Sequence, residues 1–197
     1  MHGLIIKAIQ SFVCANYGRQ TWVDSTTAAG LEFADFEAML TYDVEIYPRV
    51  LGALCCKLDR PRSDVLEDLG TYLLSHPNME GLRRLLRFGG VTYVEFLQSL
   101  DDLSDRVRLA VSDLILPQLE LQELSQSDFR LHCHSGLEGY PSVMTGVLRA
   151  MADDYGSLVF LSQEATQGPI EVLKITLVES AFAKGRNFEL GAHSHDR

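Results

Sequence analysis

The sequence predicts an α+β fold, in which an N-terminal helical subdomain is followed by a four-stranded antiparallel sheet with packed helices. Three observations lead to this prediction. Apolar residues recur three or four positions apart up to about residue 113, which is the period of a helix. From about residue 117 the pattern changes to short strand-like runs around one helix. Strands that are grouped after helices favour an antiparallel sheet in an α+β architecture.

The first helices have recognisable ends. They are expected at residues 4–17, 19–29 and 44–58. Gly18 and Gly30 follow the first two, because glycine readily adopts the left-handed backbone that ends a helix. Pro48 lies near the start of the third, where it either kinks the helix or sits in its first turn.

The next elements are also predicted as helices. Ser63 is a suitable N-cap for a helix that ends before His76-Pro77-Asn78. A short helix is expected at residues 82–88, closed by Gly89-Gly90. One long helix then runs from Thr92 through Val111, and Pro117 stops it.

The C-terminal part contains the predicted sheet. Strands are expected at residues 119–124, 129–135, 158–162 and 172–178, with a helix at 141–155 and a turn at Gly168-Pro169. Together the elements suggest a single domain over residues 1–190, with a helical part at 1–113, a sheet part at 114–190, and a flexible tail at 191–197.

Composition narrows the classes of function. The chain has 197 residues, of which 46% are hydrophobic, and a net charge of −10. Such a charge repels phosphate groups, so we expect neither nucleic acid nor a membrane surface as a partner. The sequence has no run of about 18 apolar residues and no signal-peptide pattern, which together favour a cytoplasmic protein. The main positive cluster consists of Arg83, Arg84 and Arg87.

Several strings resemble one known family over nearly the whole chain. They are Met1-His2-Gly3 leading into a helix that ends at Tyr17-Gly18, the segment 95–103 (Glu-Phe-Leu-Gln-Ser-Leu-Asp-Asp-Leu), Pro117, and the segment 139–146 (Gly-Tyr-Pro-Ser-Val-Met-Thr-Gly). The family is that of the haem nitric oxide/oxygen binding domains, known as H-NOX or HNOB. The resemblance implies the H-NOX fold and a role in nitric oxide sensing and signal transduction.

The resemblance also identifies candidate site residues. In the family, a histidine on the proximal helix ligates haem iron, and a proline presses on the haem plane. Matching the strings places Ser104 at the histidine and Pro117 at the proline. The family's Tyr-x-Ser-x-Arg motif, which binds the haem propionates, falls on residues 133–137. Only Ser135 is retained there, because Cys133 replaces the tyrosine and Leu137 the arginine.

These replacements remove the chemistry that holds haem. A neutral serine hydroxyl does not compete with imidazole for iron, and leucine cannot pair with a propionate as arginine would. We therefore expect that haem does not bind in the usual way. The apolar pocket either collapses by repacking or holds an elongated apolar ligand such as a fatty acid.

Other metal ligands are weaker candidates. Cys133 could ligate haem as a thiolate, but it would need a cationic neighbour to lower its pKa. His132 and His134 would share one strand face and could bind a divalent metal with a third ligand. A solvated sheet face is the simpler interpretation of this histidine pair.

The sequence favours a regulatory binding module over an enzyme, because it has no recognisable catalytic motif. The resemblance implies a separate signalling partner, either a histidine kinase or a cyclic-nucleotide enzyme. Occupancy of the pocket would shift the helical part relative to the sheet part. The alternatives are a genuine haem-binding nitric oxide sensor with a different axial ligand, and an enzyme acting on an apolar substrate.

Overall fold

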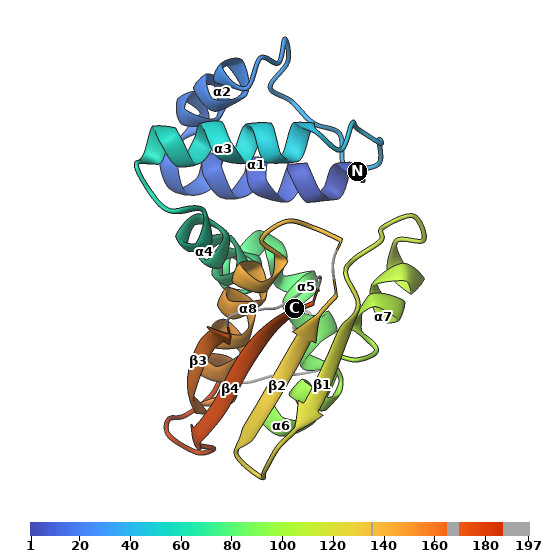
Figure 1. Cartoon of the computed structure of the whole chain (residues 1–197), viewed down its shortest axis with the longest axis vertical. Coiled ribbons are helices and arrows are strands. Elements are labelled where there is room, and N and C mark those ends of the chain that lie inside the picture. Colours follow the sequence, from blue (N-terminus) through green and yellow to red (C-terminus); the bar gives the residue numbers. More distant parts are fainter. Residues whose placement is uncertain (135, 165–169, 187–197) are drawn as a thin grey trace, which may run out of the picture.

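A computed structural model describes residues 1–134, 136–164 and 170–186 (Figure 1). Within them the helices are α1 (Gly3–Tyr17), α2 (Arg19–Ala28), α3 (Ile46–Leu58), α4 (Arg62–Ser75), the 3-10 helix η1 (Pro77–Met79), α5 (Glu80–Arg87), α6 (Tyr93–Gln98), α7 (Leu103–Ala110) and α8 (Tyr140–Tyr155). The strands are β1 (Leu119–Glu123), β2 (Asp128–Cys133), β3 (Leu158–Glu164) and β4 (Glu171–Glu179). Ser135, the predicted turn at Gly168-Pro169 and the predicted tail at 191–197 lie outside the described residues.

The four strands form one antiparallel sheet in the order β1-β2-β4-β3, which confirms the predicted fold class. Alternate residues of β2 face the core: Phe129, Leu131 and Cys133 are buried, and the residues between them are half-buried. Helix α8 comes between β2 and β3 in the chain and packs on the sheet through contacts with β3 and β4. The strand residues on the face away from α8 are mostly polar, so this face of the sheet is solvated.

The predicted helix ends are largely confirmed. Helix α1 ends at Gly18, which has a φ of 85°. Pro48 lies in the first turn of α3, where its missing N–H costs no helical hydrogen bond. The prediction that Ser63 caps α4 is wrong: the helix begins at Arg62, after Pro61, and the Ser63 hydroxyl donates to Asp64 at 3.0 Å.

The predicted long helix from Thr92 to Val111 is two helices, α6 and α7, separated by a turn. Side chains near this turn hold it in place. The Asp101 carboxylate accepts the backbone N–H of Leu121 in β1 at 2.7 Å. Arg106 donates to the backbone carbonyl of Ser99 at 2.7 Å, which satisfies an acceptor at the end of α6.

The interior divides into two apolar cores. The upper core contains buried side chains of α1 to α4 and of the loop between α2 and α3, and Trp22 and Phe36 are its largest fully buried side chains. The lower core begins at Leu74 and contains side chains of the later helices and the inner face of the sheet. Figure 1 shows α1, α2 and α3 as a helical layer above the sheet, with α4 below that layer and α8 alongside β3. Leu137 and Val143 pack against both cores and so connect them.

Helices α4 and α8 cross at very short range because glycines face the contact. A Cβ at Gly146 would lie 2.0 Å from the carbonyl oxygen of Glu67 in α4. A Cβ at Gly70 would lie 2.0 Å from the carbonyl oxygen of Val143 in α8. These positions accept only glycine without moving the helices apart, so the crossing fixes how the two cores meet.

The predicted basic cluster is not a surface patch. Arg83 and Arg87 turn inward to Asp154 of α8, with nitrogen–oxygen distances of 2.8 Å and 3.3 Å, and all three side chains are at least 87% buried. The Arg87 guanidinium also lies 3.7 Å from the ring centre of Tyr155. Arg84 keeps half of its side chain exposed. The cluster therefore connects α5 to α8 instead of offering positive charge to a partner.

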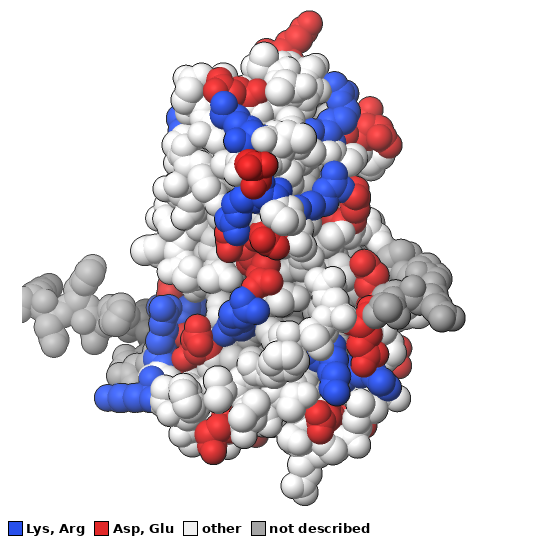
Figure 2. All heavy atoms as spheres, turned by 60° about the vertical axis from the view of Figure 1, so that its left-hand side comes forward, with Lys and Arg blue, Asp and Glu red and all other residues white. Residues whose placement is uncertain are grey.

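Positive charge on the surface is accompanied by negative charge. Ion pairs join Arg60 to Asp68, Arg62 to Glu138 and Arg149 to Glu67. On the face drawn in Figure 2, basic and acidic side chains lie next to one another. Of the helices in the described part of the chain, none is long and apolar enough to cross a membrane.

Candidate functional site

Ser104 and Pro117 are in direct contact. Ser104 lies in the first turn of α7, and its Oγ donates a hydrogen bond of 3.0 Å to the backbone carbonyl of Pro117. Pro117 is buried just before β1. A Cβ at Gly136 would lie 3.4 Å from Cγ of Pro117, so the loop after β2 also touches this proline. The Ser104 hydroxyl is thus already committed to holding α7 against the start of the sheet.

Cys133 lies at the end of β2, next to the same proline segment. It pairs with Leu119 of β1 and Glu171 of β4, and only 2% of its surface is exposed. Burial, and to a smaller degree the negative charge of Glu171, raise the pKa of its thiol from 9.0 to about 12. No cation contributes to this shift, so the condition for a thiolate ligand is not met and the thiol stays protonated near neutral pH.

Leu137 is half-buried in the loop between β2 and α8, where it packs against both cores. The same loop is held to the upper helices by Glu138. Its backbone carbonyl accepts the Tyr47 hydroxyl of α3 at 2.7 Å, and its carboxylate pairs with Arg62 of α4. Burial is the main cause that raises the pKa of Tyr47, so this hydroxyl remains a donor.

Two cavities flank these positions. One of about 420 Å³ is lined by α1, α3 and the loop after β2, and its walls include Ile5, Tyr47 and Leu137. The other, of about 520 Å³, lies beside α7 and includes Ser104 in its wall. Asp113 and Ile115 line both cavities, so the two cavities adjoin at the segment between α7 and β1. The structure thus places Ser104 and Leu137 on neighbouring cavities, with the segment that leads to Pro117 in contact with both.

The sequence pattern did not indicate the position of His2 beside the candidate site. His2 lines the cavity of about 420 Å³ and caps α1, because its Nδ1 accepts the backbone N–H of Leu4 at 3.2 Å. A neutral imidazole with an acceptor at Nδ1 carries its proton on Nε2, so it has no free lone pair for a metal unless the cap breaks. Tyr47 and Ile115 were also missed, since only the fold places them beside Leu137.

The donor set at this site does not fit haem in the way that the resemblance implies. The hydroxyl at the proximal position is weak and already hydrogen-bonded, the thiol is protonated, and Leu137 offers no positive charge. Among the residues that the structure describes, no group of three His, Cys, Asp or Glu side chains is placed to hold a metal ion. His134 lies 3.7 Å from Glu120 on the outer side of the sheet.

The protonated thiol gives a testable pH dependence. An unfolded chain loses the Cys133 proton near pH 9, whereas the folded chain keeps it until about pH 12. Folding stability should therefore fall as the pH rises above 9. Between pH 9 and 10, Cys133 should account for about 1 kcal/mol per pH unit, in addition to the slope that the buried tyrosines with raised pKa values give to every variant.

Urea unfolding at several pH values measures this slope. We expect the Cys133→Ala variant to lose the added pH dependence, whereas Cys56→Ala, at an exposed cysteine of α3, should retain it. Equal slopes in Cys133→Ala and the unchanged protein would contradict a buried, protonated thiol.

Comparison with known proteins agrees with the geometry of the fold. A sequence profile of the family described as Haem-NO-binding matches residues 2–162. Among curated relatives, soluble guanylate cyclase gcy-31 of Caenorhabditis elegans is 23% identical over 78% of this chain and 22% of its own length. Soluble guanylate cyclase 89Db of Drosophila melanogaster is 20% identical over 87% of this chain and 27% of its own length. The chain therefore spans about a quarter of these relatives.

Solved structures share the fold at low sequence identity. The Fe(II) unliganded H-NOX protein from K. algicida superimposes with a TM-score of 0.80 and 18% identity, covering 93% of this chain and 100% of that one. An oxygen-binding H-NOX domain related to soluble guanylate cyclases gives a TM-score of 0.68 and 14% identity, covering 95% of this chain and 100% of that one. At such identities the likeness establishes the fold alone.

Proposed function

Because this chain belongs to the haem-NO-binding family, we propose that it is a sensory and regulatory binding module whose pocket does not hold haem in the usual way. The observation that carries this proposal is the hydrogen bond from Ser104 to Pro117. The resemblance to the family implies an iron–imidazole bond at position 104. Here a hydrogen bond from Ser104 holds α7 in place without a metal. Leu137 likewise supplies apolar packing where a propionate clamp is expected.

The ligand that we propose is an elongated apolar molecule such as a fatty acid. The cavity of about 420 Å³ has apolar walls from Ile5, Pro48 and Leu137. The neighbouring cavity includes Arg108, whose exposed guanidinium lies 3.7 Å from the exposed Asp105. An exposed pair at this distance is weak, so Arg108 is available to a carboxylate head group.

Occupancy of this region would act on the contact between the two cores. Leu137 packs against both cores, and the adjoining Glu138 is bonded to α3 and α4. A ligand that displaces this loop would shift the helical layer relative to the sheet, and a partner that binds one arrangement would respond.

The partner is proposed from the family alone. Several relatives are named as soluble guanylate cyclases, so a cyclic-nucleotide enzyme is the leading class, and a histidine kinase is the second. In this proposal the described region is a sensor without catalytic activity of its own, and it acts in the cytoplasm as one unit over residues 1–190.

Haemin titration tests the proposal. We expect the purified chain to give no saturable Soret band and no spectral change with nitric oxide, while its circular dichroism remains that of a folded protein. The matched variant carries both missing groups, Ser104→His and Leu137→Arg. We expect it to gain a saturable band, because it combines an imidazole ligand with a cation for the propionates.

A stoichiometric Soret band in the unchanged chain would overturn the proposal and favour a haem sensor with a different axial ligand. A second measurement looks for the ligand directly: the purified protein is extracted with organic solvent, and the extract is analysed by mass spectrometry. A co-purified lipid that is lost in a Leu137→Glu variant supports an apolar pocket, because a carboxylate at that position would oppose both apolar and anionic ligands.

A further inference from the structure

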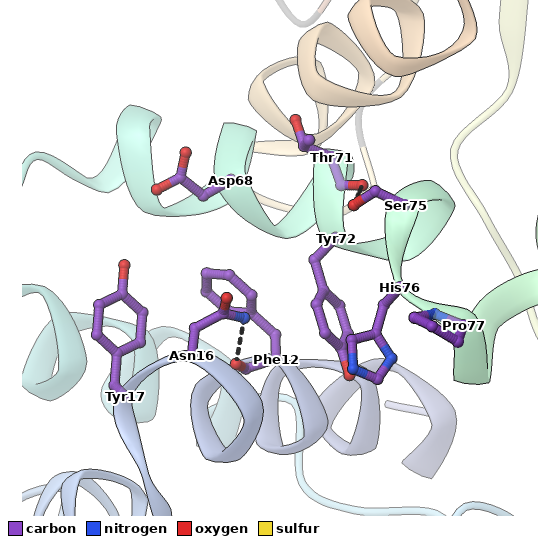
Figure 3. A pocket seen from close by; sticks show the side chains of 9 residues that line it. All are labelled: Phe12, Asn16, Tyr17, Asp68, Thr71, Tyr72, Ser75, His76 and Pro77. Atoms are coloured by element: carbon purple, nitrogen blue, oxygen red, sulfur yellow. Dashed lines mark hydrogen bonds between the residues drawn. The ribbon is translucent and has the colours of Figure 1, made fainter. Parts of the chain in front are cut away.

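A third hollow lies away from the site described above. It is a groove of about 330 Å³ between the C-terminal half of α1 and one side of α4, and it shares no lining residue with the two cavities near Ser104 and Leu137. Figure 3 shows Asp68, Thr71 and Ser75 on α4 and Asn16 and Phe12 on α1, with the Tyr72 ring extending from α4 toward α1. We refer to this hollow as the α1–α4 groove.

The polar atoms of the α1–α4 groove are mainly acceptors. The Thr71 hydroxyl donates its proton to the carbonyl of Glu67 at 3.2 Å, and the Ser75 hydroxyl donates to the carbonyl of Thr71 at 2.8 Å. Both oxygens therefore have only lone pairs left for a ligand. The Asn16 side-chain nitrogen donates one of its two N–H groups to the carbonyl of Phe12 at 2.9 Å, and the amide oxygen is a further acceptor.

Asp68 adds negative charge to this row of acceptors. Its Oδ2 accepts from Arg60, and within the described residues its Oδ1 has no hydrogen-bond partner. About 45% of the Asp68 side chain is exposed, so this oxygen can be reached from the groove. A carboxylate oxygen accepts strongly from a charged N–H donor.

Aromatic rings complete the walls of the groove. Phe12 contacts Tyr72 edge-on, with ring centres 5.6 Å apart, and Tyr72 lies against the His76 ring at 4.7 Å. Tyr17 packs on the other side of Phe12 at 5.8 Å. Phe12 and Tyr72 are only 3% and 7% exposed, so they give the groove an apolar wall beside the Asp68 carboxylate.

We propose that the α1–α4 groove binds a small organic cation whose head carries several N–H donors, either a guanidinium or a primary ammonium. The acceptors on α4 can receive such donors, and a volume of about 330 Å³ suits a small molecule. The proposal is independent of what occupies the cavities near Leu137.

Isothermal titration with two probes of the same shape tests this inference. n-Butylguanidinium carries the charge, and n-butylurea is its neutral counterpart. We expect n-butylguanidinium to bind at least about tenfold more tightly, because hydrogen bonds to charged donors are about twice as strong as neutral ones. Equal binding of the two probes, or no binding of n-butylguanidinium at millimolar concentration, would overturn the proposal.

Variants of α4 locate the binding. Asp68→Asn should reduce the affinity for n-butylguanidinium about tenfold, and Thr71→Val should reduce it several-fold while leaving the Arg60–Asp68 pair intact. Asp64→Asn is the matched control, because Asp64 is an exposed carboxylate of α4 outside the groove. If Asp64→Asn weakens binding as much as Asp68→Asn does, the effect is one of overall charge and the groove is not the site. Circular dichroism establishes that each variant is folded.

Discussion

Replacing Gly146 by alanine should lower the free energy of unfolding by about 3 kcal/mol, which is a large effect for one methyl group. The reason is the crossing of α8 with α4. The added Cβ would lie 2.0 Å from the carbonyl oxygen of Glu67 and 2.8 Å from the backbone nitrogen of Thr71. Both atoms belong to the backbone of α4, so no side-chain rotation relieves the contact and the helices must separate. Gly70→Ala should act similarly, through the backbone of Val143.

Thermal and urea unfolding measure this effect, with an expected fall in Tm of roughly 6–12 °C. Gly81→Ala is the matched control, because Gly81 is also helical but a Cβ there meets no atom within 4 Å. That control should be stabilised by up to about 1 kcal/mol, since alanine is the better helix former. If Gly146→Ala were as stable as Gly81→Ala, the helices would not cross at the distance described here.

Replacing Asp154 by asparagine should also destabilise the fold, by about 3–5 kcal/mol. The carboxylate faces Arg83 and Arg87, and its own side chain is only 4% exposed. Its removal takes away the negative charge that two largely buried guanidinium groups share, 10% and 13% exposed, although Arg83 keeps Glu80 as a partner at 3.1 Å. A charge that is buried without its counter-ion costs far more than a surface pair contributes.

Asp153→Asn provides the control, because this neighbouring carboxylate in α8 is exposed. It should change stability by no more than about 0.5 kcal/mol. The double variant Arg83→Met with Asp154→Leu should recover part of the loss, since it removes one buried charge together with its counter-ion. Similar unfolding curves for Asp153→Asn and Asp154→Asn would indicate that the ion cluster contributes little.

Local sequence patterns predicted most of the elements. The four strands and the antiparallel sheet follow from alternating side chains between turn residues, and Gly18 marks the end of α1 as expected. The break between α6 and α7 was not predictable in this way, because its apolar positions keep the helical spacing. Asp101 and Arg106 end the helix by bonding to β1 and to the end of α6, and only the fold brings these groups together.

The candidate site was predicted in part. The resemblance located Ser104, Pro117, Cys133 and Leu137, but not the hydrogen bond that joins the first two or the raised pKa of the third. The side chains of His2 and Tyr47 were not predicted to border Leu137. They come from distant parts of the chain, and nothing in the local pattern of either segment refers to the loop after β2.

By itself, the sequence determined which segments are helices and strands, the family, and the loss of the histidine and arginine that the family resemblance leads one to expect. Each of these depends on residue identity and on spacing along the chain. The tertiary structure alone decided that Arg83 and Arg87 turn inward to Asp154, that Gly70 and Gly146 allow two helices to touch, and where the cavities lie. Burial and contact depend on which surfaces meet, and residues far apart in the chain acquire partners only when the elements pack.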